Sequence, residues 1–347
     1  MVGNIVGPTP PDIKEKCLHL CRDYLGGVWL NITVADIIVK RITGGLVNQL
    51  YYCGINEDKQ TSDEKVPQEV SIRLYQNKLL INFNNKGYER LTDVIIAQLL
   101  SEKQLGPKIY GLFESGQIMK YYKHKRFRNE EQNNPKLVAE LASKLARIHA
   151  TDVPIRRTVC PVFNNYDMLY SDAMRLFDIN LLVNECNCET LRDHNLSDEL
   201  LWLRKTVDAV DSPIAFTHLD FRGGYDFGSA FADWGRLWDI EDTRIQFPTD
   251  NEIKPFVESY MKESVKIFGK EFTRDERNSL KNLIKEVKVF SLCGLMFYTL
   301  FTLKMNQSFN PDIPFDKKAV MQRTEYFYKN YYNLKERIIK ENLLNKP

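Results

Sequence analysis

Two kinds of hydrophobic pattern divide this chain into a strand-rich first part and a helix-rich second part. Up to about residue 122, most apolar segments are short and are bounded by glycine-containing or polar turns, which is typical of β-strands. Helical spacing in this part is limited to residues 13–25 and 87–103. The predicted strands cover residues 36–42, 47–55, 70–75, 108–113 and 117–122.

After about residue 123, apolar residues recur every three or four positions, which is typical of amphipathic helices. The helices predicted there cover residues 135–150, 166–183, 196–210, 228–240, 250–268, 274–305 and 317–343, with one short strand at 214–217. We therefore predict an α+β protein with a small N-terminal lobe (residues 1–122) and a larger helical lobe (residues 123–347). No Gly/Ser/Pro-rich linker separates the two parts, so we expect two lobes that share one cleft.

The composition is that of a globular protein, and it argues against several other classes of protein. The chain has 347 residues and a net charge of +2, and its near-neutral balance argues against a protein that coats nucleic acid. Residues 287–303 are the most apolar stretch, but Lys288, Ser291 and Thr299 interrupt it, so we expect a buried helix and no transmembrane segment. Seven cysteines without zinc-site spacing, in a sequence without a secretory signal, predict reduced thiols in a cytoplasmic protein.

Two features of the strand-rich part carry candidate chemistry. Gly44 and Gly45 lie between the first two predicted strands, where glycine can bring bare backbone N–H groups close to phosphate oxygens. An ordinary hairpin turn explains the pair at least as well. Arg73 lies in an otherwise apolar strand, where a charge is costly unless it is paired. A guanidinium can hold phosphate through two parallel hydrogen bonds, and a side chain that points to solvent is the alternative.

Five segments, in order along the chain, resemble the choline/ethanolamine kinase family. RITGGLVNQL (residues 41–50) resembles its nucleotide loop, and EVSIRLY (69–75) resembles its third strand. LGPKIYGLF (105–113) resembles the segment that leads to its interlobe hinge. AFTHLD (215–220) resembles the start of its catalytic loop, and YDFGSAFADW (225–234) resembles the helix entry beyond its metal site.

This resemblance implies a bilobal, protein-kinase-like fold with a nucleotide-binding first lobe. It implies an enzyme that uses ATP and Mg²⁺ to phosphorylate the hydroxyl of choline or ethanolamine at the first step of phospholipid head-group synthesis, and it implies a homodimer. By resemblance, Gly44, Gly45 and Arg73 hold the nucleotide phosphates, and Asp93 on the following helix pairs with Arg73. Tyr121 lies where adenine would be held, although a plain core or surface aromatic is an equally good interpretation.

The resemblance also assigns residues of the second lobe. Asp220 is the base that accepts the proton of the substrate hydroxyl, and His218 braces the loop through backbone hydrogen bonds. Asp226 caps the next helix and ties the catalytic loop down. Asp233 and Trp238 resemble the acidic and aromatic residues that face the substrate amine, and core packing is an equal alternative for Trp238.

The chain departs from the family pattern directly after Asp220. A kinase catalytic loop has an Asn five residues after its Asp, whereas position 225 here is Tyr. The strand pair that carries the family's second metal-binding Asp is missing as well, because a single short step joins Asp220 to Asp226. The usual Mg²⁺ ligands are therefore absent. We predict that turnover is very low or absent, since losing such charge stabilisation typically costs several kcal/mol.

Two explanations of this departure compete. An internal deletion, through a skipped exon, a variant transcript or a gene-model error, would leave both flanking motifs well formed, as they are here. A genuine pseudokinase that binds nucleotide or a partner kinase subunit is the alternative. We favour the deletion, because slow sequence decay would also blur the flanking motifs.

The sequence is compatible with more than one substrate. The late apolar helix carries Cys293 and Met296 where choline-selective members usually have tryptophans, so an aromatic cage for trimethylammonium looks weakened. Ethanolamine or another small amino alcohol therefore stays open beside choline. A kinase-fold relative that acts on another hydroxyl substrate, such as an aminoglycoside, fits the LGPKIYG segment less well.

Overall fold

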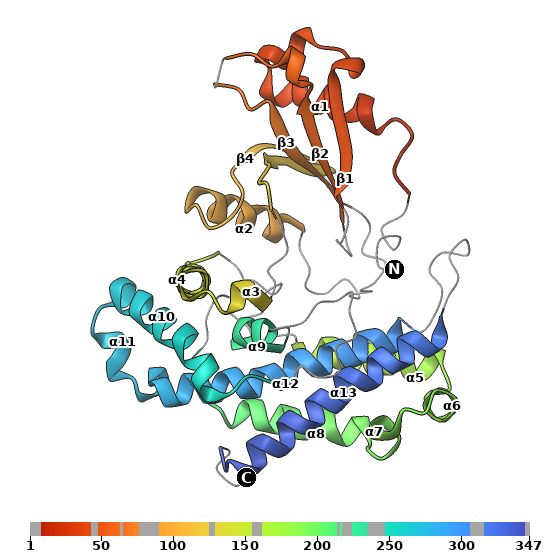
Figure 1. The fold of residues 1–347 in the computed structure, drawn as a ribbon, viewed down its shortest axis with the longest axis vertical. Helices are drawn as coiled ribbons and strands as arrows, with labels where there is room; N and C mark the ends of the chain where they lie inside the picture. The colour runs from red at the N-terminus through yellow and green to blue at the C-terminus, as the bar shows by residue number, and fades with distance from the viewer. Residues whose placement is uncertain are drawn as a thin grey trace. The chain divides into compact units, whose positions relative to one another are not determined.

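The computed structural model describes residues 8–42, 48–62, 65–75, 90–124, 129–154, 162–213, 224–232, 247–305 and 316–343, together with residues 216 and 234. The described residues form two units (Figure 1). The first unit holds the described residues up to 124, and the second holds those from 129 onward. The expected division of function between residues 1–122 and 123–347 stays a prediction.

The first unit is built on an antiparallel sheet of five described strands in the order β1-β2-β3-β5-β4. Each predicted strand is present, and its ends lie within two residues of the expected ones. The strands are β1 (Ile37–Ile42), β2 (Asn48–Ile55), β3 (Glu69–Tyr75), β4 (Ile109–Phe113) and β5 (Gly116–Lys120). The helical segments of this unit are α1 (Ile13–Leu25), α2 (Arg90–Glu102) and single 3₁₀ turns at Gly27–Asn31, Val34–Asp36 and Glu57–Lys59.

One face of this sheet packs against helix α1. The register of the strands places Tyr51, Ile72 and Ile118 on that face, and all three are fully buried in one cluster with the apolar stripe of α1. Helix α1 ends at Gly26, whose φ of +65° is a conformation that glycine adopts at little cost. Alternate residues of the strands point to the opposite face of the sheet.

The second unit is a group of helices around α12 (Leu280–Lys304), with α13 (Lys317–Lys340) beside it (Figure 1). Helix α9 (Gly224–Ala232) also packs on α12, and Gly228 permits the close approach because an added Cβ would overlap the backbone carbonyl of Phe290. The other described helices are α3 (Asn129–Gln132), α4 (Pro135–His149), α5 (Val162–Leu176), α6 (Ile179–Glu185), α7 (Glu189–Arg192), α8 (Leu196–Asp208), α10 (Asp250–Phe268) and α11 (Glu271–Arg274), with a 3₁₀ turn at Glu276–Asn278.

Helix α12 is long and apolar enough to cross a membrane by length and composition, but 89% of its most apolar window is buried inside the unit. The expectation of a buried helix at residues 287–303 is confirmed. Its polar residues are accommodated within the helix, since the hydroxyls of Ser291 and Thr299 donate to the carbonyls of Val287 and Leu295 one turn earlier.

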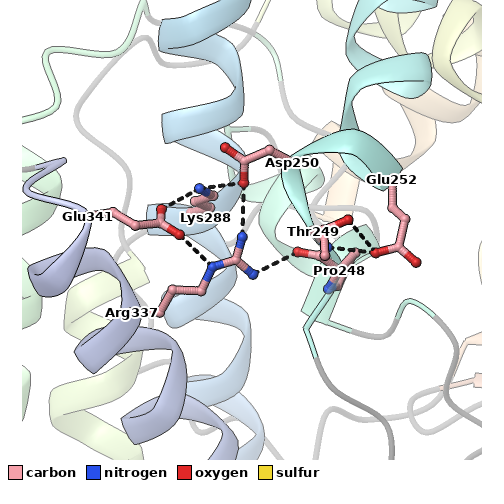
Figure 2. Close-up of polar contacts among 7 residues, drawn as sticks. All are labelled: Pro248, Thr249, Asp250, Glu252, Lys288, Arg337 and Glu341. Atoms are coloured by element: carbon pink, nitrogen blue, oxygen red, sulfur yellow. Dashed lines mark hydrogen bonds and ion pairs between the residues drawn. The ribbon is translucent and has the colours of Figure 1, made fainter.

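A cluster of four charged residues joins three helices of the second unit (Figure 2). The Lys288 side chain on α12 is only 1% exposed, and its Nζ lies 2.6 Å from Asp250 at the start of α10 and 2.5 Å from Glu341 after α13. Arg337 on α13 reaches the same two carboxylates at 2.9 and 2.7 Å. Two cations therefore face two anions, which offsets the desolvation cost of the buried ammonium group.

Three helix predictions differ from the structure. Residues 166–183 form two helices, because the Asp178 carboxylate accepts the Leu181 backbone N–H and caps a new helix, α6. Residues 274–305 also divide, since Ser279 caps α12 in the same way. Helix α9 begins at Gly224, earlier than the expected residue 228. The strand predicted at 214–217 lies outside the described residues, apart from residue 216.

Candidate functional site

The face of the sheet away from α1 carries polar residues at its centre. Arg73 on β3 is paired with Gln117 on β5, and Ser71 is paired with Met119, so these four side chains share that face. Gln117 and Ser71 are buried and hydrogen-bonded: the hydroxyl of Ser71 donates to backbone carbonyls of β5, and Gln117 accepts from the hydroxyl of Tyr75. Arg73 is half-buried among them. Fixed polar groups therefore surround Arg73 on this face.

The guanidinium of Arg73 is held by Asn48, the first residue of β2. Its Nε and Nη2 both donate to the amide oxygen of Asn48, at 3.1 and 2.8 Å. The amide is assigned with its oxygen toward Arg73, because this orientation gives both amide atoms complementary neighbours. The strand cation expected from the sequence is therefore anchored by a neutral side chain across the strand pair.

Asp93, the expected ion-pair partner of Arg73, lies in the first turn of α2 and is exposed. A carboxylate at a helix N-terminus is favourable in its own right, because it faces the positive end of the helix dipole. Among the described residues, the Arg73 guanidinium bonds to Asn48 rather than to Asp93, and the pairing with Asp93 stays a prediction.

Gly44 and Gly45 lie outside the described residues, but both flanks of their segment are described. The segment 8–9 contacts each flank: the Arg41 guanidinium donates to the Thr9 hydroxyl at 3.3 Å, and the Gln49 amide donates to the Pro8 carbonyl at 3.1 Å. Gln49 is nearly fully buried, and it also accepts from the hydroxyl of Tyr51 at 2.7 Å. The ends of β1 and β2 that flank the glycines are thus both tied to the N-terminal segment.

Tyr121 follows β5, and its ring packs edge-on against Tyr52 of β2, with ring centroids 4.7 Å apart. Tyr52 lies on the same sheet face as Ser71, and burial, followed by the nearby Glu69 carboxylate, raises the pKa of its hydroxyl. Tyr121 is half-buried, whereas its neighbour Tyr122 is 49% exposed. An aromatic pair therefore lies at the end of this sheet face, and the contact of Tyr121 with adenine stays a prediction.

The expected catalytic residues of the second part, His218 and Asp220, lie outside the described residues. The expected substrate residues Asp233 and Trp238 lie outside them as well. Their roles stay predictions, and the described residue nearest to them in the sequence that carries charge is Asp226.

Asp226 is completely buried in the first turn of α9, where it meets two residues that the sequence did not single out. His149, the last residue of α4, places Nε2 3.3 Å from the Asp226 carboxylate and Nδ1 2.9 Å from the hydroxyl of Tyr260 on α10. The imidazole also packs edge-on against the rings of Phe227 and Tyr260, which contact each other. Burial raises the pKa of Tyr260, which keeps its hydroxyl protonated. This cluster links α4, α9 and α10.

Asn48 and His149, which the sequence did not single out, left different signals there. Asn48 directly follows the glycine segment, and a hairpin register would have placed it diagonally across from Arg73. His149 interrupts the apolar stripe of α4 with a titratable residue, but its partner Asp226 is 77 residues away, so spacing alone could not reveal the contact.

Cys293 and Met296, where aromatic residues were expected around a substrate amine, are both completely buried in the core of α12. They therefore pack against other helices of the second unit. Among the residues that the structure describes, no group of three His, Cys, Asp or Glu side chains is placed to hold a metal ion.

Comparison with known proteins gives a match to one protein family. A model of the family described as choline/ethanolamine kinase matches residues 39–225, more than half of the chain. The match ends at Tyr225, where the family's Asn was expected.

Individual relatives extend the similarity beyond that segment. A human protein named choline/ethanolamine kinase is 25% identical over 328 residues, which cover 84% of this chain and 80% of its own. A Dictyostelium discoideum protein named probable ethanolamine kinase A is 24% identical over 355 residues, covering 96% of this chain and 95% of its own. That alignment is longer than the 347 residues of this chain, so the relative has residues for which this chain has no counterpart.

A crystal structure of choline kinase from Cryptosporidium parvum has a TM-score of 0.70 to this chain at 16% identity. The match covers 95% of this chain and 97% of the other one. The expected α+β, kinase-like fold is confirmed.

Proposed function

This chain belongs to the choline/ethanolamine kinase family, and from that premise we propose that it is built to transfer the γ-phosphoryl group of ATP to the hydroxyl of choline or ethanolamine. The observation that carries the nucleotide part is the Arg73 guanidinium, which Asn48 orients on the polar face of the sheet. A guanidinium held by a neutral acceptor keeps its full charge for an anion, so the residues present fit the phosphates of ATP.

The residues proposed for the transfer step lie in the second part of the chain. Asp220 accepts the proton of the substrate hydroxyl while the substrate oxygen attacks the γ-phosphorus and the bond to the ADP oxygen breaks. His218 braces the loop, and Asp233 and Trp238 hold the substrate amine. Asp226, fixed by His149, anchors the helix that begins four residues after Asp220.

The residues of this chain do not fit Mg²⁺ in the way that kinases hold it. Tyr225 offers a phenol where an Asn amide oxygen is needed, and the second Asp of the family pattern has no counterpart. Losing one preorganised charge-stabilising group costs roughly 10²–10³ in turnover, so we expect this chain to turn over far more slowly than a complete family member.

The second candidate function is a catalytically inactive chain that binds nucleotide or a partner kinase subunit. The observation that supports it is the sequence after Asp220, where Tyr225 stands in place of the Asn that a kinase catalytic loop carries. An internal deletion and an evolved pseudokinase give the same protein chemistry, and sequencing the transcript across codons 215–230 separates them.

The setting that we propose follows the family. The reaction belongs to the first step of phospholipid head-group synthesis in the cytoplasm, carried out by a homodimer. Cysteine chemistry is in keeping with this compartment, because the six cysteines in the described part of the chain are all free and buried. Choline and ethanolamine both stay open as substrates, because Cys293 and Met296, where aromatic residues were expected, are buried in the core of the second unit.

A kinase assay with ATP, Mg²⁺ and either choline or ethanolamine tests the proposal. Slow formation of the phosphorylated product, abolished by Asp220→Asn and unaffected by Asp208→Asn at the exposed end of α8, would support the enzyme. An ATP-induced rise in melting temperature without product would favour the inactive nucleotide binder. Turnover comparable with that of a complete family member would refute the assignment of the missing metal ligands.

A further inference from the structure

We propose that Asn48 is a positioning residue that aims the Arg73 guanidinium at a nucleotide phosphate. The proposal rests on the nucleotide binding proposed above and adds a residue to which no role had been assigned. It starts from one contact, in which Nε and Nη2 of Arg73 share the amide oxygen of Asn48 at 3.1 and 2.8 Å.

The geometry of this contact leaves one side of the guanidinium available. A guanidinium has five N–H donors in one plane, and Asn48 uses one from Nε and one from Nη2. The remaining three belong to the two terminal nitrogens, which form the fork that binds phosphate oxygens in pairs. Within the described residues, Asn48 is the only side chain with which the Arg73 guanidinium forms a hydrogen bond or ion pair.

The charge of the partner matters as much as its position. A carboxylate at position 48 would form the same two hydrogen bonds but would cancel the charge of Arg73. An amide fixes the side chain and leaves that charge uncompensated, which is what recognition of an anion requires. An Asn in this place therefore argues for an anionic ligand, whereas a purely structural anchor would gain more from Asp.

The position of Asn48 along the chain connects this anchor to the glycine segment. Asn48 begins β2 and immediately follows residues 43–47, and it lies diagonally across from Arg73 on the same sheet face. The Gln49 side chain on the opposite face is fixed by Pro8. The start of β2 is thus held from both sides, so Arg73 is anchored to a rigid part of the sheet.

The test compares ATP with adenosine in the full-length protein, because only ATP carries the phosphates. We expect Asn48→Asp and Asn48→Ala each to weaken ATP binding about tenfold or more while adenosine binding stays within a factor of about two. Asn56→Asp is the matched control, because it introduces the same negative charge just beyond the other end of β2. We expect its ATP affinity to equal that of the wild type.

A double substitution tests whether Asn48 acts through Arg73. In an Arg73→Ala background, Asn48→Ala should cause no further loss of ATP affinity, because its only route to the phosphate is gone. Equal losses for ATP and adenosine, or an undiminished loss in the Arg73→Ala background, would overturn the positioning role.

A measurement on the ligand-free protein keeps this proposal separate from the proposed function. In protein with ¹⁵N-labelled arginine, the Arg73 Nε–H resonance should exchange slowly with water and should lose that protection in Asn48→Ala. If wild-type protein binds neither ATP nor inorganic triphosphate, the nucleotide function fails, and so does the phosphate-directed role of Asn48. If both ligands bind and the Nε–H protection is the same in wild type and Asn48→Ala, the positioning role alone is refuted.

Discussion

Replacing Glu286 by Gln should stabilise the protein at pH 8 and have little effect at pH 5. Glu286 lies on α12 and is only 4% exposed, and this burial is the main reason why its pKa is raised from 4.5 to about 7. A hydrogen bond from Ser212 and the charges of Lys285 and Arg277 act in the opposite direction and offset only part of the effect. The folded protein therefore disfavours the charged form of this side chain.

The sign and the size follow from linkage between protonation and folding. Because the folded-state pKa of Glu286 is raised, stability is greatest below pH 4.5 and is lost as the pH rises toward 7. At about 1.36 kcal/mol for each pH unit, the difference between 4.5 and about 7 amounts to about 3 kcal/mol above pH 7. Gln cannot ionise, so the variant should gain about 3 kcal/mol at pH 8 and less than about 1 kcal/mol at pH 5.

Urea unfolding followed by a spectroscopic signal of the helical unit, at pH 5 and at pH 8, measures this difference. Glu336→Gln is the matched control, because Glu336 is exposed on α13 and should show the same stability as wild type at both pH values. A gain of equal size at both pH values would trace the effect to packing. Loss of stability at pH 8 would show that the Glu286 carboxylate is held favourably, and either result would refute the reasoning from burial.

Two substitutions and one labelling experiment test the packing of the two units. Lys288→Ala should destabilise the second unit by about 2 kcal/mol in urea unfolding, because the buried methylene groups of Lys288 are lost while Arg337 still pairs with Asp250 and Glu341. Gly228→Ala should lower the melting temperature and increase hydrogen exchange in α9, since the added Cβ meets the carbonyl of Phe290. The six described cysteines should react with a thiol reagent at pH 8 only after unfolding, because they are buried, and burial contributes to the raised pKa of three of them. Rapid labelling of these cysteines in the native protein would contradict their burial.

The fold was accessible from the sequence wherever one side of an element faces the core. Short apolar segments between glycine-containing or polar turns predicted all five described strands, whose alternate residues meet the α1 side of the sheet. Hydrophobic periodicity did not predict the helix boundary at Asp178, because apolar residues continue at helical spacing on both sides of this N-cap residue. A single side-chain hydrogen bond to the Leu181 backbone ends one helix and starts another, and hydrophobic periodicity does not register such a bond.

The candidate site could be predicted from the sequence only in part, because some of its contacts join residues that are far apart in the chain. Arg73 was found because a charge in an apolar strand is costly, and that cost is visible within seven consecutive residues. Its anchor Asn48 belongs to another strand, and the His149–Asp226 contact spans 77 residues, so both depend on tertiary structure. The sequence shows that a charge needs a partner, and the fold determines which residue becomes that partner.

The residues proposed for nucleotide recognition and those proposed for phosphoryl transfer lie in different parts of this chain. The sheet face that holds Arg73 is completed by hydrogen bonds within the first unit, and none of them involves the region after Asp220. The residues needed to neutralise charge in the transition state would come from that region, where Tyr225 replaces the expected Asn. Loss of that region should consequently reduce turnover while the contacts proposed for ATP persist. Substitutions at Asn48 and at Asp220 separate the two properties, because the first should change ATP affinity and the second should change only the residual rate.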